Sequence, residues 1–141
     1  MSEFTNHKDL DAWQVAMELV VLAYRVSAGF PNDEKYGLIA QMRRAAVSVP
    51  SNIAEGQVRG LTRACVNYLA IALGSLAELD TQLELAVRLR YITREAAIDL
   101  ERLIVSSRRL VYGLRRNKLT RLGLSAAGTA IALSFAVRLC L

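Results

Sequence analysis

Hydrophobic positions repeat every three to four residues along most of the chain, which predicts helices rather than strands. The clearest segment lies in the middle of the sequence, where apolar and small residues keep a four-three spacing over three heptads, as in a packed helical seam. The seam consists of Cys65, Leu69, Ala72, Leu76, Leu79, Leu83 and Ala86. Thr62 is placed to cap this helix at its N-terminus. Gly74 costs about 1 kcal/mol of helix propensity relative to alanine, which close approach of a neighbouring helix would explain.

Two helices are predicted before this segment. The first covers roughly residues 9–28, and its apolar stripe consists of Leu10, Trp13, Met17, Val20 and Tyr24. After a break at residues 29–32, the second covers about residues 34–57, with Asn32 or Asp33 as its N-cap. Its inward positions are Leu38, Met42, Ala45, Val49 and Ile53. Pro50 falls inside this helix and should bend it locally.

A fourth helix is predicted after Thr93, which can cap it, with Glu95 in the first turn. Its inner face consists of Ala97, Leu100, Ile104, Ser107, Val111 and Leu114. Four amphipathic helices with short connections predict an all-α fold, an antiparallel up-down four-helix bundle. We expect this bundle to form one domain over residues 1–118.

Residues 119–141 form an apolar C-terminal segment of a different kind. Residues 122–137 are uncharged, a run of 16 that is shorter than the 20 or so residues a membrane-spanning helix needs. Three interpretations stay open for this segment: a fifth helix on the bundle, a loosely ordered tail, or a weak membrane anchor flanked by arginines. We favour a soluble appendage over membrane insertion.

The composition argues against an enzyme. The 141 residues include 2 cysteines and 1 histidine, His7, which leaves no disulfide framework, no zinc cluster and no Ser-His-Asp or Cys-His arrangement. No catalytic residue, metal site or cofactor is therefore predicted. The polar N-terminus does not resemble a signal peptide, so we expect a cytoplasmic protein.

Charge is concentrated near one end of the sequence. Residues 108–141 carry seven basic and no acidic residues, although the whole chain has a net charge of only +5. Such a cluster can bind RNA, DNA, other polyanions or anionic lipid, or can simply keep a helix face soluble. The predicted nucleic-acid-binding residues are Arg108, Arg109, Arg115, Arg116, Lys118 and Arg121, with Arg43 and Arg44 secondary.

The second helix also carries a polar stripe. It consists of Gln41, Arg44, Ser48, Asn52, Glu55 and Arg59. Asn52 and Glu55 can interact as helical neighbours, and Glu55 precedes Arg59 by four residues, the favourable order for an ion pair. We expect a structural stripe, a solvated face or a network between protomers, rather than a catalytic centre.

Several short motifs resemble the 23S rRNA intervening-sequence protein family. They are Phe30-Pro31 with Glu34, Gly37-Leu38 and Gln41, then Arg43-Arg44 and Ser48, the run Asn52-Ile53-Ala54-Glu55-Gly56, and Gly74-Ser75-Leu76 with Glu78-Leu79. The resemblance covers about residues 4–115. It implies a small four-helix bundle, often a homopentamer, encoded within bacterial ribosomal RNA genes or alone. A similar bundle, the accessory protein of diversity-generating retroelements, implies nucleic acid and a reverse transcriptase as partners.

The chain departs from the family pattern at three places. Ala64-Cys65 stands where an acidic residue and phenylalanine are usual, Pro50 precedes the Asn-Ile-Ala-Glu-Gly run, and residues 119–141 have no counterpart. We therefore predict a non-catalytic homo-oligomer that binds RNA or DNA electrostatically. A protein-protein scaffold or a membrane-tethered bundle are the alternatives.

Overall fold

The computed structural model describes residues 6–124 as four α-helices and two short 3-10 helices. Helix α1 covers Asp11–Ser27, α2 covers Leu38–Val58, α3 covers Arg63–Arg88 and α4 covers Arg94–Arg121. The 3-10 helices η1 (His7–Asp9) and η2 (Asn32–Glu34) precede α1 and α2. No strand occurs in the described part of the chain, so the prediction of an all-α fold with four helices is confirmed there.

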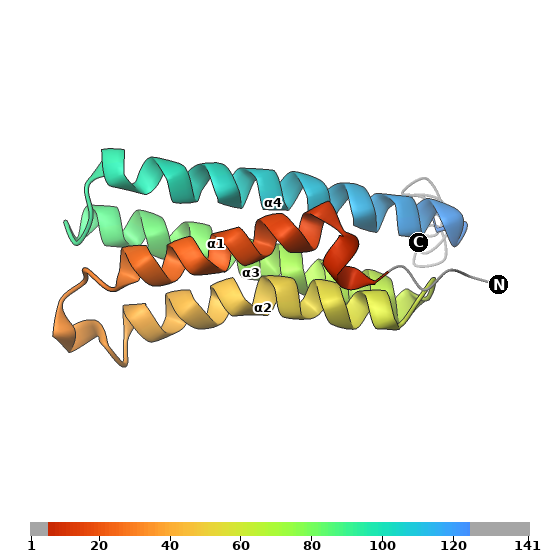
Figure 1. Cartoon of the computed structure of the whole chain (residues 1–141), viewed down its shortest axis with the longest axis horizontal. Helices are drawn as coiled ribbons and strands as arrows, with labels where there is room; N and C mark the ends of the chain where they lie inside the picture. Colours follow the sequence, from red (N-terminus) through yellow and green to blue (C-terminus); the bar gives the residue numbers. More distant parts are fainter. Residues whose placement is uncertain (1–5, 125–141) are drawn as a thin grey trace, which may run out of the picture.

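Successive helices run back and forth along the long axis of the molecule (Figure 1). Helix α1 packs against α2 and α4, and α3 packs against α2 and α4, so the four helices surround one core. Both ends of the described chain lie toward the same end of the bundle (Figure 1).

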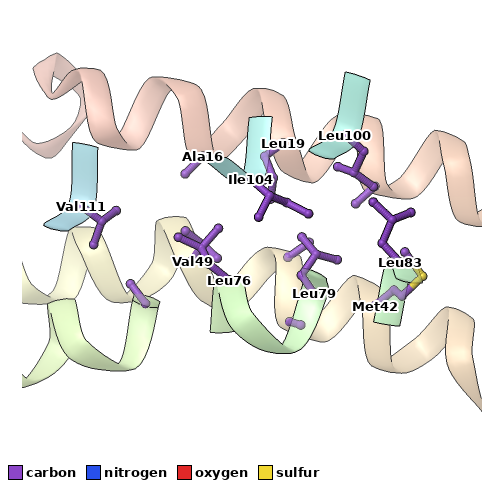
Figure 2. Packing of buried hydrophobic residues seen from close by; sticks show 14 of the residues in the cluster. Ala16, Leu19, Met42, Val49, Leu76, Leu79, Leu83, Leu100, Ile104 and Val111 are labelled. Atoms are coloured by element: carbon purple, nitrogen blue, oxygen red, sulfur yellow. The ribbon is translucent and has the colours of Figure 1, made fainter. Parts of the chain in front are cut away.

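The core is built in layers from all four helices. Figure 2 shows Met42, Leu83 and Leu100 gathered at one level, and Val49, Leu76 and Ile104 at another. The predicted seam of α3 and the inward positions of α2 are all buried, so both predictions are confirmed. Each fully buried leucine or isoleucine stabilises the fold by roughly 1.5–3 kcal/mol.

The predicted inward stripe of α1 was wrong in part: Leu10, Trp13 and Val20 pack against the core, but Met17 and Tyr24 do not. Its buried residues are Ala12, Ala16, Leu19, Ala23 and Ser27. Met17 and Tyr24, which belonged to the predicted stripe, are 37% and 42% exposed, while Leu10, Trp13 and Val20 are only partly buried. Apart from Leu19, the buried positions of α1 are small residues, and the larger side chains flank them.

Helix caps agree with the sequence at two sites and differ at a third. The hydroxyls of Thr62 and Thr93 accept hydrogen bonds from backbone amides of the first turns of α3 and α4, each 3.2 Å long. Helix α2 begins four residues later than predicted, and neither Asn32 nor Asp33 caps it. Instead Glu34 accepts a hydrogen bond of 2.8 Å from the amide of Leu38.

Helix α4 continues past residue 118 and ends in a Schellman turn. Gly123 has a φ of +69°, and its amide donates to the carbonyl of Thr120 (3.0 Å). The amide of Leu124 reaches back to the carbonyl of Leu119 (2.9 Å), which completes the motif. The remainder of the predicted C-terminal segment, residues 125–141, lies outside the described residues. Within residues 6–124, no helix is long and apolar enough to cross a membrane.

Candidate nucleic-acid interface

The six basic residues predicted on α4 have different surroundings. Arg108 is half-buried and pairs with Asp80 of α3 at 2.8 Å, while Arg115 donates to the carbonyl of Val66 at 3.4 Å. Both side chains therefore hold α4 against α3. Each contact uses only part of the guanidinium, but it ties the side chain to α3.

Lys118 is the most buried of the residues predicted for the interface. It is only 9% exposed, although the sequence placed it among the surface cations. It lies near enough to Cys65 of α3 to act on the pKa of that thiol, which burial raises and the positive charge of Lys118 partly lowers. Lysine can pack its aliphatic stem against apolar neighbours. It therefore fits at position 118, which lies seven residues after Val111 on the buried face of α4.

Arg43 joins α2 to α1. Its guanidinium donates to the hydroxyl of Ser27 (3.0 Å) and the carbonyl of Tyr24 (3.4 Å), and it stacks 4.5 Å from the Tyr24 ring centroid. This residue is engaged within the bundle, whereas Arg44 is exposed and lines a groove between α2 and α3.

The predicted cations that remain exposed and without an ion pair among residues 6–124 are Arg109, Arg116 and Arg121, besides Arg44. Sequence reasoning missed Arg102, which precedes Arg109 by seven residues. Arg102 contacts Asp99 at 3.5 Å, but both side chains are more than three quarters exposed. An exposed pair of this kind contributes little. The spacing of seven residues between Arg102 and Arg109 is the sequence signal for this residue. A charge count that begins at residue 108 leaves Arg102 out.

Exposed apolar residues alternate with these arginines on the same face of α4. Ile98, Val105 and Tyr112 are 36%, 50% and 56% exposed and also follow one another every seven residues. We call the combined set the outer stripe of α4: Ile98, Arg102, Val105, Arg109, Tyr112 and Arg116. In a helix of 3.6 residues per turn this spacing gives one continuous face, which points away from the buried positions Leu100, Ile104 and Val111.

The polar stripe of α2 is mainly a set of contacts within the chain. The Ser48 hydroxyl lies 2.8 Å from that of Ser75 on α3, and the Asn52 amide donates to the carbonyl (2.7 Å) and hydroxyl (2.9 Å) of Ser48. Glu55 and Arg59 form the ion pair that their spacing favours, at 2.6 Å. The hydrogen bond that Arg59 donates to the carboxylate of Glu55 raises the pKa of Arg59. The structure gives no hydrogen bond between Asn52 and Glu55; Asn52 turns toward Ser48 instead.

One end of this stripe opens into a groove of about 390 Å³ between α2 and α3. It is lined by Gln41, Arg44, Ala45, Ser48, Ile71, Ser75, Glu78 and Gln82. The side-chain carbonyl oxygen of Gln82 is buried there without a hydrogen-bond partner among the described residues. Over the same residues, no three His, Cys, Asp or Glu side chains gather in a way that could hold a metal ion.

Comparison with known proteins places this architecture in a family. The model of the 23S rRNA-intervening sequence protein family matches residues 8–113. The crystal structure of a protein of unknown function from the S23 ribosomal protein family of Bacteroides thetaiotaomicron VPI-5482 is similar, with a TM-score of 0.67 and 26% identity. The alignment covers 74% of this chain and 98% of that one. A search of curated proteins finds no match.

The family match covers well over half of the chain, including α1, α2, α3 and most of α4. The structural likeness extends over nearly the whole of the Bacteroides protein. The chain therefore belongs to the 23S rRNA-intervening sequence protein family.

Proposed function

We propose that this protein is a non-catalytic, homo-oligomeric antiparallel bundle that binds RNA or DNA electrostatically through the outer stripe of α4. The observation that carries this proposal is the contrast among the arginines of α4. Arg108 and Arg115 are held by α3, whereas Arg109 and Arg116 are exposed without an ion pair among residues 6–124.

The electrostatic surroundings of the stripe support a polyanionic partner. From Leu103 to Leu124 the sequence contains no acidic residue, so no acidic side chain of this part of α4 neutralises Arg109 and Arg116. When exposed arginines neutralise the phosphates of a nucleic acid, its counterions are released into solution. Such contacts bind nucleic acid with little preference for its sequence. Arg121, in the last turn of α4, adds a further positive charge to the same end of the bundle.

The test is RNA binding across a salt series with the double variant Arg109→Glu/Arg116→Glu. Each lost phosphate contact should lower the slope of log affinity against log salt by about one, so the double variant should lose about two. The matched control is Arg25→Glu/Lys35→Glu, which changes net charge equally and lies outside the stripe. No binding by the wild type at low salt, or equal effects of the two double variants, would contradict the proposal.

Homo-oligomerisation is a separate part of the proposal. A Cβ built on Gly74 meets nothing within 4 Å, so no helix of the described chain approaches this face of α3. The family resemblance implies a pentamer. A second copy packed against α3 would explain why a glycine stands at position 74. Several copies would also raise avidity by repeating the outer stripe. Light scattering on the purified protein measures the subunit number, and a monomer would contradict this part.

A protein-protein scaffold is the second candidate function. It is favoured by a hollow of about 440 Å³ between α1 and α4, lined largely by apolar groups that include Met17, Val21 and Leu103. Exposed apolar surface of this kind often marks a protein interface. A scaffold predicts that Met17→Asp weakens capture of a partner while RNA binding is absent.

A membrane tether is the other alternative, and it depends on residues 125–141. It predicts that the wild type, but not a chain ending at Leu124, pellets with vesicles.

A further inference from the structure

Tyr112 differs from the other tyrosines of the chain. Tyr24, Tyr68 and Tyr36 lie beneath the cations of Arg43, Arg59 and Lys35, at 4.5, 5.6 and 5.5 Å from the ring centroids. Tyr91 donates a hydrogen bond of 3.0 Å to Glu34 and packs against Phe30. Tyr112 is 56% exposed and has neither a hydrogen bond nor a ring contact with any residue the structure describes.

The ring stands between two cations of the proposed interface. Arg109 lies three residues before Tyr112 and Arg116 four residues after it, which makes both of them neighbours on the helix surface. A Cβ built on the adjacent Gly113 would meet nothing within 4 Å, so the surface beside the ring is open. A flat group could therefore reach Tyr112 without displacing another side chain.

This arrangement combines the two features used to bind unpaired nucleic acid. Cations follow the phosphate backbone, and an exposed aromatic ring offers a surface on which any base can stack. A duplex keeps its bases paired and stacked, so its phosphates can meet the arginines but its bases cannot reach the ring without unstacking. The ring therefore favours single strands over duplexes.

Resting on the proposed function, we infer that Tyr112 stacks on an unpaired base while Arg109 and Arg116 hold phosphates on either side, so that the outer stripe prefers single-stranded nucleic acid. The arginines alone would suit an acidic helix equally well, because both ligands are anionic. The exposed ring of Tyr112, which has no partner among the described residues, favours a ligand with flat bases.

The experiment compares fluorescence anisotropy of one labelled RNA as a single strand and as a duplex with its complement. Tyr112→Ala should weaken single-strand binding about tenfold, within the range measured for lost base-aromatic contacts, and change duplex binding less than twofold. Tyr112→Phe keeps the ring and should bind like the wild type. Tyr36→Ala, which removes another exposed tyrosine outside the stripe, should have no effect. Since no charge is lost, Tyr112→Ala should keep the wild-type salt slope.

Four outcomes separate this inference from the proposed function. If Tyr112→Ala leaves single-strand affinity unchanged while Arg109→Glu/Arg116→Glu weakens it, the inference is wrong and the proposed function stands. Equal losses for single strand and duplex also overturn the inference. Absence of any RNA binding overturns both. If a helical peptide with glutamates at heptad spacing displaces the RNA and binds Tyr112→Ala more weakly, the stripe is a helix-docking face instead. Circular dichroism checks that each variant is folded.

Discussion

Two buried hydroxyl groups have opposite hydrogen-bonding environments. Ser75 is hydrogen-bonded to Ser48 at 2.8 Å and to the carbonyl of Ile71 at 3.1 Å. The hydroxyl of Ser107 is fully buried and has no partner among the described residues. An unsatisfied buried polar group costs roughly 1–3 kcal/mol, whereas a satisfied one contributes to stability.

Ser107→Ala should therefore raise the free energy of unfolding by about 1 kcal/mol, because it removes an uncompensated hydroxyl and adds no volume. Ser75→Ala is the control and should lower it, because it breaks two hydrogen bonds. Urea unfolding of the two variants measures both changes. A destabilised Ser107→Ala protein would mean that the hydroxyl has a partner after all.

Two glycines inside helices differ in the space around them. A Cβ on Gly56 of α2 would lie 3.3 Å from both the carbonyl oxygen of Cys65 and the Cβ of Tyr68, which marks a close approach of α2 to α3. A Cβ on Gly74 of α3 meets nothing within 4 Å in the described chain. Alanine should thus be tolerated differently at the two positions.

Gly74→Ala should stabilise a monomeric bundle by up to about 1 kcal/mol, which is the helix-propensity difference. Gly56→Ala should gain less or lose stability, because the backbone of α3 must move to admit the methyl group. Thermal melts at low protein concentration compare them. Equal stabilisation by both substitutions would contradict the close approach at Gly56.

Helices α3 and α4 are also joined by an ion-pair network around Glu84. Its carboxylate accepts hydrogen bonds of 2.8 Å from both Arg94 and Arg88, and Arg94 reaches Glu101 at 3.2 Å. Arg94 first, and then Arg88, lower the pKa of Glu84 from 4.5 to about 2. The unfolded chain therefore takes up this proton before the folded chain as the pH falls.

The stabilisation from Glu84 should be present above about pH 4.5 and be lost as the pH falls toward 2. Glu84→Gln should accordingly lower Tm at pH 7 and flatten the dependence of Tm on pH between those two values. Asp99→Asn, which loses only the exposed pair with Arg102, should keep the wild-type slope. An unchanged slope in Glu84→Gln would contradict the network.

On the scale of the whole molecule, the Schellman turn sets where the folded domain can be cut. A chain ending at Leu124 keeps the hydrogen bonds of Gly123 and Leu124 to the last turn of α4. A chain ending at Lys118, the predicted domain boundary, loses that turn and its cap. A cap contributes roughly 1 kcal/mol, so the shorter chain should melt about 4 °C lower. Equal melting temperatures would place the boundary at residue 118.

Much of the fold could be predicted because the helical period is strong and the caps are local. The seam of α3, Thr62 and Thr93 depend only on neighbouring residues, and each was correctly assigned. The inward face of α1 was not, because its alanines give a weaker hydrophobic signal than Met17 and Tyr24.

The candidate interface was harder to predict because it depends on contacts between helices. Charge counting cannot distinguish Arg108, which pairs with Asp80 of another helix, from Arg109, which has no such partner. It also cannot reveal that Lys118 is buried or that Arg43 lies against Tyr24. Such differences arise only when sequence-distant elements meet.

An even number of alternating helices brings residues 6 and 124 toward the same end of the bundle (Figure 1). A reporter fused directly to residue 6 or to residue 124 would then stand at one end of the bundle and leave the η2 loop free at the other. Because residues 6 and 124 lie toward the same end, a linker could join them, and the chain could be reopened near Tyr36, which is 87% exposed. Such a circular permutant would carry its termini at the opposite pole, with the same core and the same surface arginines.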